Sequence, residues 1–402
     1  MTALKNNLSN RLVIVDALRG FALMGLFLIH MVEYFELYWY QPEPGTVHDM
    51  MFFLFGGKAY ATFALLFGVS FFIQMENQAK KGIDFRARFA WRLTLLLIMG
   101  YLHGLLYSGD ILQVLAVSGL LLLLVYQQSN KVILLLALTF LLQVPLILHF
   151  IFTLIDSSTI NSQPLHWSLM SESFDIYANG NFEQVIATNM FNGQFGKWMF
   201  FIESGRIYTV LGLFLLGLFV ARQGYFSKIT QHKKQIFTGF VIAILSALIC
   251  HYFSSLAQSF AQAFTLTGMS LWLFNTIVTS YLNLSLTFGG ILLFCLLYQL
   301  PVLTRLLKLL APCGRMSLTL YVAQSLIGVP LFYGFAMGGF QSLGQVNSLL
   351  LGFCLWLLQR FFAHLWLKHY KYGPLEWGWR SLTYGKKVKN SLAISMVSVR
   401  NY

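Results

Sequence analysis

Four titratable residues near one end of the predicted helices have the types that proton transfer needs: His30, His103, Asp110 and Glu203. A histidine suits general acid–base catalysis near neutral pH, and a neighbouring carboxylate fixes its tautomer and raises its basicity. We predict that His103 or His30 is the catalytic base and that Asp110 or Glu203 assists it. Seven residues of continuous helix would hold His103 and Asp110 about 10 Å apart, so their contact requires a bend at Ser108-Gly109.

These residues also have a purely structural interpretation. Asp110 is a good N-cap for the next helix, and Gln113 three residues on would complete a capping box. His103 would then only form a hydrogen bond to a neighbouring helix. Glu203 and Arg206 are spaced i, i+3, which predicts an interfacial ion pair of small energy. Arg206 and Gln324 are further candidates for binding the substrate.

A second polar group is expected at the opposite depth of the membrane. Asp16 and Arg19 are spaced i, i+3, so they share a helix face and can neutralise each other, which offsets the cost of charge inside a spanning helix. Arginines beside small-residue turns suit a phosphate-bearing ligand, because guanidinium groups bind phosphate through two parallel hydrogen bonds. The alternative is that the arginines only orient the helices and that Glu376 and Arg380 form an i, i+4 pair. We predict cofactor binding by this group: Asp16, Arg19, Arg315, Glu376 and Arg380.

Long apolar segments must position both groups. Of the 402 residues, 57% are hydrophobic and 10% are charged, whereas a soluble domain carries about 25% charged residues. Apolar runs of about 20 residues recur along the chain, which is the length of a transmembrane helix. We predict an all-α polytopic membrane protein of ten transmembrane helices, over residues 12–31, 57–74, 91–108, 111–127, 131–152, 203–222, 236–257, 273–299, 315–336 and 345–366.

The distribution of charge indicates how these helices are oriented. The net charge of +13 would suit a nucleic-acid-binding protein, but lysine and arginine gather in alternate connections and the acids gather in the others. This positive-inside pattern predicts cytoplasmic N and C termini and contact with membrane lipids, and it argues against a nucleic-acid partner. The first apolar run contains Asp16 and Arg19 and lacks a small-residue cleavage site, so we predict an uncleaved first span.

One connection is much longer than the others. Residues 153–202 combine Pro164, Gly180 and Gly193 with several aromatic side chains, which predicts an ordered periplasmic cap with short helices, for example around residues 183–191. The predicted organisation is a five-helix part at 1–152, the cap at 153–202, a second five-helix part at 203–384 and a basic cytoplasmic tail at 385–402.

Several motifs are missing from the sequence. It has no HExxH motif and no paired Cys/His spacing, so no metal site is predicted. It has no Walker A or GxGxxG motif for nucleotide phosphates. Its four cysteines are scattered through apolar or cytoplasmic sequence and imply no disulfide framework.

Four segments carry motifs of a known family: Asp16 to Gly20, Gly100 to Leu112, Gly314 to Tyr321 and Gly373 to Tyr384. With these motifs, nearly the whole chain resembles the YeiB-like proteins, the bacterial family called domain of unknown function 418. That family is grouped with transmembrane acyltransferases, which are similar to this chain in the D-x-x-R-G start of the first span. Most YeiB-like relatives have Asn at the position of His30, whereas acyltransferase-3 members have His near it, so both histidines stay candidates.

The resemblance implies an activity and a location. It implies an enzyme of the bacterial inner (cytoplasmic) membrane that moves an acyl group from cytoplasmic acyl-CoA, its donor co-substrate, to a periplasmic hydroxyl or amine on a small molecule or a glycan. One alternative is a multi-helix transporter or exporter, proton-coupled through the same residues. Another is a non-catalytic membrane scaffold. The oligomeric state is left open, a homo-oligomer included.

Overall fold

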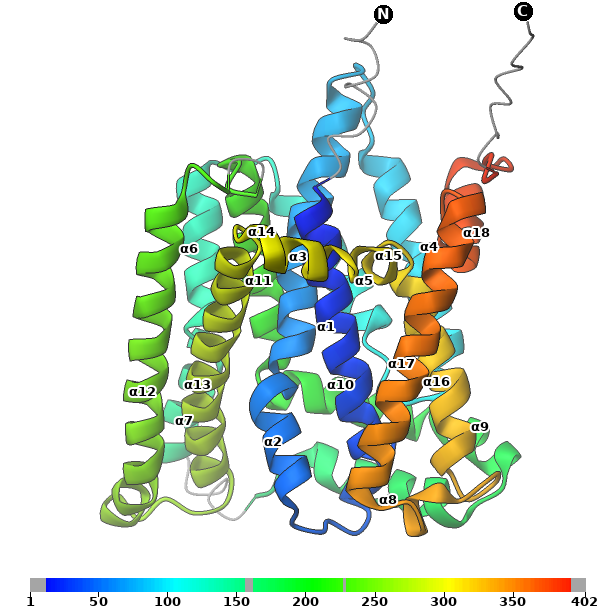
Figure 1. Cartoon of the computed structure of the whole chain (residues 1–402). Coiled ribbons are helices and arrows are strands. Elements are labelled where there is room, and N and C mark those ends of the chain that lie inside the picture. Colours follow the sequence, from blue (N-terminus) through cyan, green and yellow to red (C-terminus); the bar gives the residue numbers. More distant parts are fainter. Residues whose placement is uncertain (1–11, 156–161, 227–228, 392–402) are drawn as a thin grey trace, which may run out of the picture.

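The computed structural model describes residues 12–155, 162–226 and 229–391, and α-helices dominate this part of the chain (Figure 1). The first half contains α1 (Val13–Val32), the short 3-10 helix η1 (Leu37–Trp39), α2 (Thr46–Phe55), α3 (Lys58–Ala79), α4 (Arg86–Leu106), α5 (Leu112–Val125), α6 (Asn130–Leu141), α7 (Val144–Ile155), α8 (Leu165–Asn179), α9 (Phe182–Met190) and α10 (Asn192–Glu203). The second half contains α11 (Arg206–Arg222), α12 (Lys233–Ala263), α13 (Gly268–Leu297), α14 (Pro301–Lys308), α15 (Ala311–Arg315), α16 (Ser317–Phe332), η3 (Gly339–Gln341), α17 (Gly344–His369) and α18 (Pro374–Tyr384).

Each of the ten predicted apolar segments corresponds to a helix or a pair of helices. Six helical segments are long and apolar enough to cross a membrane, and they contain α1, α2 with α3, α4, α12, α13 and α17. Two further crossings are possible if the bent pairs α6–α7 and α10–α11 each count as one span. The other two segments are the shorter apolar helices α5 and α16. The chain is therefore a polytopic helical membrane protein with six to eight candidate spans by length and composition, while ten crossings and their orientation stay predictions.

The two bent pairs have identifiable causes in the backbone. Gly205, between α10 and α11, has φ +69°, and Gln143, between α6 and α7, has φ +54°. A left-handed residue interrupts the i→i−4 hydrogen-bond ladder, so the helix axis changes direction there. The bends are 67° for α10–α11 and 44° for α6–α7.

Helix α1 runs through the middle of the bundle from one end to the other (Figure 1). We call the end near Val13 the terminal end, because α18 and the start of α1 lie there, and the opposite end the cap end. Near its terminal end α1 crosses the short helix α15 at Gly20 and Gly314. A Cβ on Gly20 would overlap the carbonyl oxygen of Leu310, and one on Gly314 would overlap that of Asp16. Only glycine permits this approach of two backbones.

The periphery of the bundle is apolar, as a lipid-facing surface should be. Helices α12 and α13 pack as a hairpin at one side of the molecule (Figure 1). The outer face of α12 exposes Phe237, Ile242, Leu245, Leu248 and Phe253. Such a continuous exposed apolar face on a long helix is stable only against lipid or a partner.

Three helices, α8, α9 and α10, gather at the cap end. They occupy most of the segment predicted as a cap, and α9 covers the short helix expected around residues 183–191. An Asn181 capping box with Gln184 starts α9. The domain boundaries predicted from the sequence stay predictions, and residues 156–161 and 392–402 of those domains lie outside the described part of the chain.

Candidate functional site

His103 and Asp110 are in direct contact at the cap end of the bundle. Helix α4 ends at Leu106, Tyr107 is extended, and the chain turns at Ser108-Gly109, so the bend that the contact requires is present. His103 Nδ1 lies 2.8 Å from Asp110 Oδ1, and both side chains are buried. An ionised carboxylate can only accept, so the imidazole donates through Nδ1. The tautomer that results carries its lone pair on Nε2, which is the atom a general base needs.

The Nε2 atom of His103 is buried and has no hydrogen-bond partner in the described part of the chain. The rings nearest to His103 belong to Tyr321, at 5.3 Å between centroids, and Tyr107, at 6.2 Å. The Tyr321 hydroxyl accepts from the amide of Ile111 (3.1 Å), which ties α16 to the turn that carries Asp110. A buried polar atom without a partner is costly, so this nitrogen is the feature that most suggests a ligand.

Asp110 also holds the start of α5, so its structural and functional interpretations are compatible. Its second oxygen, Oδ2, accepts from the amide of Gln113 (3.3 Å). The capping box suggested by the sequence is not complete, however. The Gln113 side chain donates instead to Gly100 O (3.1 Å) and to Gln194 Oε1 (2.8 Å), because α10 packs beside it. The buried amine of Lys197 donates to the same Gln194 oxygen (2.6 Å), so a lysine that the sequence did not single out joins this polar network.

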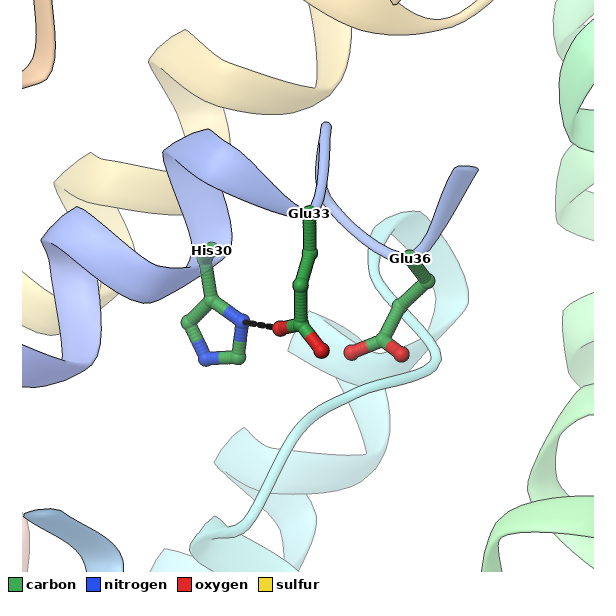
Figure 2. Close-up of side chains that lie close together, drawn as sticks. All are labelled: His30, Glu33 and Glu36. Atoms are coloured by element: carbon green, nitrogen blue, oxygen red, sulfur yellow. Dashed lines mark ion pairs between the residues drawn. The ribbon is translucent and has the colours of Figure 1, made fainter. Parts of the chain in front are cut away.

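His30 belongs to a second, adjacent cluster with Glu33 and Glu36 (Figure 2). His30 Nδ1 lies 3.5 Å from Glu33 Oε2. The backbone brings Glu36 back toward His30 through three successive left-handed residues, since Tyr34, Phe35 and Glu36 have φ of 53°, 52° and 81°. Each left-handed non-glycine residue costs on the order of 1–2 kcal/mol. The fully buried ring of Phe35, packed against Tyr107 and Phe332, helps to hold this turn.

Tyr107 joins this cluster to the His103 site. Its hydroxyl lies 3.0 Å from His30 Nδ1 and 2.9 Å from Glu36 Oε1, to which it donates. Sequence reasoning assigned no role to Glu33, Glu36 or Tyr107. Two features of the sequence could have pointed to these residues: the i, i+3 spacing from His30 to Glu33, and the position of Tyr107 between His103 and Asp110. The left-handed turn that brings Glu36 back to His30 could not be predicted from the sequence.

The same cluster is the candidate for a metal among the described residues. The ligand atoms of His30, Glu33 and Glu36 all lie within 4.8 Å of one another. Their existing partners already account for the arrangement, since Tyr107 donates to Glu36 and the indole N–H of Trp39 donates to Glu33 Oε1 (3.2 Å). Hydrogen bonding therefore explains the cluster without an ion.

Glu203 does not join His103 and does not pair with Arg206. It accepts from the ring Nδ1 of His166 (2.6 Å) and from the amides of Leu165 and His166, so it caps the start of α8. The i, i+3 pair predicted with Arg206 is absent from the described ion pairs, because the helix is broken at Gly205 and the two residues no longer share a face. Of the two carboxylates proposed as assistants to a histidine base, Asp110 alone contacts His103.

Arg206 instead lies over two rings and lines a polar pocket. Its guanidinium carbon is 4.4 Å from the centroid of Phe200 and 5.5 Å from that of Tyr60. The pocket has a volume of about 240 Å³ and also touches Trp272. One face of α13 supplies most of its polar lining: Asn275, Thr276, Thr279, Ser280, Asn283 and Thr287. In the described residues only Thr287 of these six has a side-chain hydrogen bond, to the carbonyl of Asn283 (2.7 Å).

At the terminal end, Asp16 and Arg19 form the predicted pair and bind other helices too. Arg19 Nη1 lies 3.3 Å from Asp16 Oδ1 and 3.4 Å from the carbonyl of Gly314, and Nη2 donates to Ser70 Oγ (2.6 Å). Arg315 donates to the carbonyl of Lys371 (3.3 Å). Arg19 thus ties α1 to α3 and α15, and Arg315 ties α15 to the connection between α17 and α18.

The remaining predicted residues also contact other residues of the protein. Glu376 does not pair with Arg380 but caps α16, accepting from the amides of Leu318 (2.8 Å) and Thr319 (3.2 Å) and from the Thr319 hydroxyl. Burial raises the pKa of its carboxyl above the ordinary 4.5. Gln324 donates to Gln359 (3.0 Å) within the bundle. Arg380 lies 4.4 Å over the ring of Tyr372 and lines a second pocket.

The fold and site together define a polytopic helical membrane protein with a buried histidine–carboxylate pair at one end of the bundle. Residues 220–386 match the family described as Protein of unknown function (DUF418), and residues 11–176 match the family described as heparan-α-glucosaminide N-acetyltransferase, catalytic. The chain is 27% identical to YeiB of Escherichia coli, over 93% of this chain and 96% of that protein. The predicted resemblance to the YeiB-like family, within the transmembrane acyltransferases, is therefore confirmed.

Two proteins of Bacillus are similar over comparable lengths. One is an uncharacterized 39.9 kDa protein of Bacillus acidopullulyticus, 27% identical over 94% of this chain and 96% of that protein. The other is YxaH of Bacillus subtilis, 24% identical over 96% of this chain and 97% of that protein. No solved structure matches the chain.

Proposed function

We propose that this protein is a membrane acyltransferase in which His103, oriented by Asp110, is the general base. The observation that carries the proposal is the buried Nε2 of His103, which lacks a partner while Nδ1 is held by a carboxylate. This is the arrangement of a histidine ready to take a proton. The match of residues 11–176, which include both residues, to an acetyltransferase catalytic family supports the reaction class.

In the proposed step, His103 Nε2 takes the proton from a hydroxyl or amine of the acceptor, whose oxygen or nitrogen attacks the thioester carbonyl of an acyl-CoA. The carbon–sulfur bond breaks, and the departing thiolate takes the proton from the imidazolium. Asp110 stabilises the imidazolium while it exists. His103 ends the cycle as it began, with one acylated acceptor and one free thiol produced.

We assign the acceptor to the polar pocket at Arg206 and α13. Hydroxyl and amide side chains along a helix of a membrane bundle are costly unless they face water or a polar ligand. Five such side chains have no partner in the described chain, so they can bind the hydroxyl groups of a small molecule or glycan. In the positive-inside orientation, this pocket would face the periplasm of the inner membrane and the donor would enter from the cytoplasm.

The test uses the purified full-length protein in lipid nanodiscs with acetyl-CoA, and measures free thiol with and without cell-envelope extract as a source of acceptor. The wild type and His149→Gln, which changes an exposed histidine on α7, should both release thiol. His103→Gln should lose about 10²-fold or more of the rate. Equal rates in all three proteins, or none in the wild type with extract present, would contradict the proposal.

A transporter is the second candidate, and the linked polar groups at His30, Glu36 and Tyr107 are the observation in its favour. Such chains can relay protons within a membrane. Uptake of radiolabelled sugars into proteoliposomes under an imposed pH gradient, without any acyl donor, would support transport. Thiol release without such uptake would support acyl transfer.

A further inference from the structure

A second pocket is lined by residues of α3, α4 and α18. Helix α18 lies at the terminal end of the bundle (Figure 1), whereas His103 is near the opposite end of α4. Its volume is about 210 Å³. The lining contains three cations, Lys81, Arg92 and Arg380, and three amides, Gln74, Asn77 and Gln78, but no carboxylate. Sequence reasoning identified Arg380 alone among these cations.

Arg92 is the most unusual member of this group because it is buried. Arg92 is only 8% exposed, and its guanidinium carbon lies 3.9 Å from the centroid of the Trp379 ring. The Trp379 indole N–H donates to the carbonyl of Arg92 (2.8 Å), so α18 holds the arginine from two sides. A buried guanidinium is expensive unless an anion or good acceptors compensate it.

The neighbouring carboxylates do not provide that compensation, because each has another partner. Glu76 pairs with Lys80 (3.3 Å), Asp84 pairs with Arg86 (2.7 Å), and Glu376 caps α16. Within the described residues, no carboxylate lies within 4.0 Å of the charged nitrogens of Lys81, Arg92 or Arg380. The pocket therefore has an excess of positive charge.

We propose that this pocket, formed by Lys81, Arg92 and Arg380, binds a phosphate group of a ligand. Two guanidinium forks and an ammonium match the charge and geometry of a phosphate ester or pyrophosphate, and the amides can donate to its remaining oxygens. Such a group occurs in two sources, the phosphates of coenzyme A and the head groups of anionic lipids. Assigning it to coenzyme A rests on the proposed acyl transfer, whereas the anion site does not.

The position of the pocket fits the donor. Arg92 and His103 belong to the same helix, eleven residues apart, which is about three turns and about 16 Å along one face. A coenzyme A phosphate held at Arg92 would leave its extended pantetheine arm directed along α4 toward His103. This proposal replaces Arg19 and Arg315, which contact other parts of the bundle, as the expected phosphate ligands.

The test is a binding measurement on the full-length protein in nanodiscs of zwitterionic lipid. Two adjacent lysines form a matched pair, since Lys81 lines the pocket while Lys80 pairs with Glu76. Coenzyme A should bind the wild type and Lys80→Gln equally, and Lys81→Gln, Arg92→Gln and Arg380→Gln at least about tenfold more weakly. Pantetheine, which lacks phosphate, should bind all variants weakly. Thermal unfolding identifies any of the three pocket variants that does not fold. The test then rests on the affinities of the two remaining pocket variants.

The source of the phosphate is decided by a second arm with nanodiscs that contain phosphatidylglycerol. If phosphatidylglycerol, but not coenzyme A, binds with the same dependence on Arg92 and Arg380, the anion site is supported and the donor assignment is overturned. If no phosphate probe distinguishes Arg380→Gln from Lys80→Gln, the anion site itself is overturned. Coenzyme A binding that depends on Arg380 in a protein without thiol release would support the site while contradicting acyl transfer.

Discussion

Arg92 and His103 lie on the same face of α4, three turns apart, and both are buried. Arg92 faces a pocket lined by cations at the terminal end, and His103 contacts Asp110 at the cap end. One continuous helix thus fixes the distance between a candidate anion site and a candidate base. This rigidity makes the two functions separable by mutation, because changes at one end should leave the other end intact.

Substitution Asp110→Asn should separate the orienting role of this residue from simple packing. The amide is the same size, but its NH2 group can only donate. Either the Gln113 amide loses its acceptor, or His103 Nδ1 must accept, which moves the ring proton to Nε2 and removes the base. We expect thiol release to fall by about 10²-fold or more, and thermal stability to fall by about 1 kcal/mol. Asp49→Asn, at a largely exposed carboxylate, is the control that should keep both. Undiminished thiol release in Asp110→Asn would refute the orienting role.

Removing the Tyr107 hydroxyl should destabilise the His30 cluster. Tyr107→Phe keeps the ring against Phe35 but leaves the half-buried Glu36 without its donor, at a cost of up to about 3 kcal/mol. Chemical unfolding of Tyr107→Phe, Glu36→Met and the double variant measures their coupling, because methionine keeps the side-chain length without an oxygen acceptor. Tyr252→Phe, at an exposed tyrosine on α12, is the control. Additive effects of the two single substitutions would show that this contact contributes no coupling.

The crossing of α1 and α15 should tolerate no Cβ. Gly20→Ala would push against the carbonyl oxygen of Leu310, so the helices must move apart, at a cost of about 1–3 kcal/mol. Gly290→Ala on α13 meets nothing within 4 Å and should be neutral or stabilising by up to about 1 kcal/mol. Thermal unfolding in detergent compares the two variants. Equal midpoints would mean that the crossing adapts at little cost.

Glu376 should give the protein a pH-dependent stability. Because burial raises its pKa above the ordinary 4.5, the folded state binds more protons than the unfolded state between that value and the raised one. Its contribution is fully present below pH 4.5 and is lost as the pH rises through the folded pKa. Unfolding midpoints measured from about pH 4 to pH 8 should fall in the wild type and fall less in Glu376→Gln. Glu76→Gln, at an exposed carboxylate, should keep the wild-type slope. Parallel curves for the wild type and Glu376→Gln would show that Glu376 does not cause the pH dependence of stability.

The sequence predicted the residue types of the site better than their partners. The contact between His103 and Asp110 could be stated as a condition, because Ser108-Gly109 is a recognisable turn. Helical spacing offered the pairs Glu203–Arg206 and Glu376–Arg380 as structural alternatives, and neither forms among the described residues. A helix break separates the first pair, and the Glu376 carboxylate caps α16 instead. Spacing along a helix predicts neighbours only where no other element competes for the side chain.

By itself the sequence determined that the chain is a polytopic helical membrane protein. In lipid, the backbone N–H and C=O groups of a long apolar segment must form hydrogen bonds within the protein, and a helix provides them. It also predicted the ten apolar helical segments, each of which is a helix or a pair of helices, and it predicted that charged residues gather at two depths. The tertiary structure decided which of those residues meet: His103 with Asp110, His30 with Glu36 through Tyr107, and Arg92 with Arg380 across one pocket. Such contacts depend on left-handed turns, helix breaks and glycine crossings, whose geometry is set by packing between segments far apart in the chain.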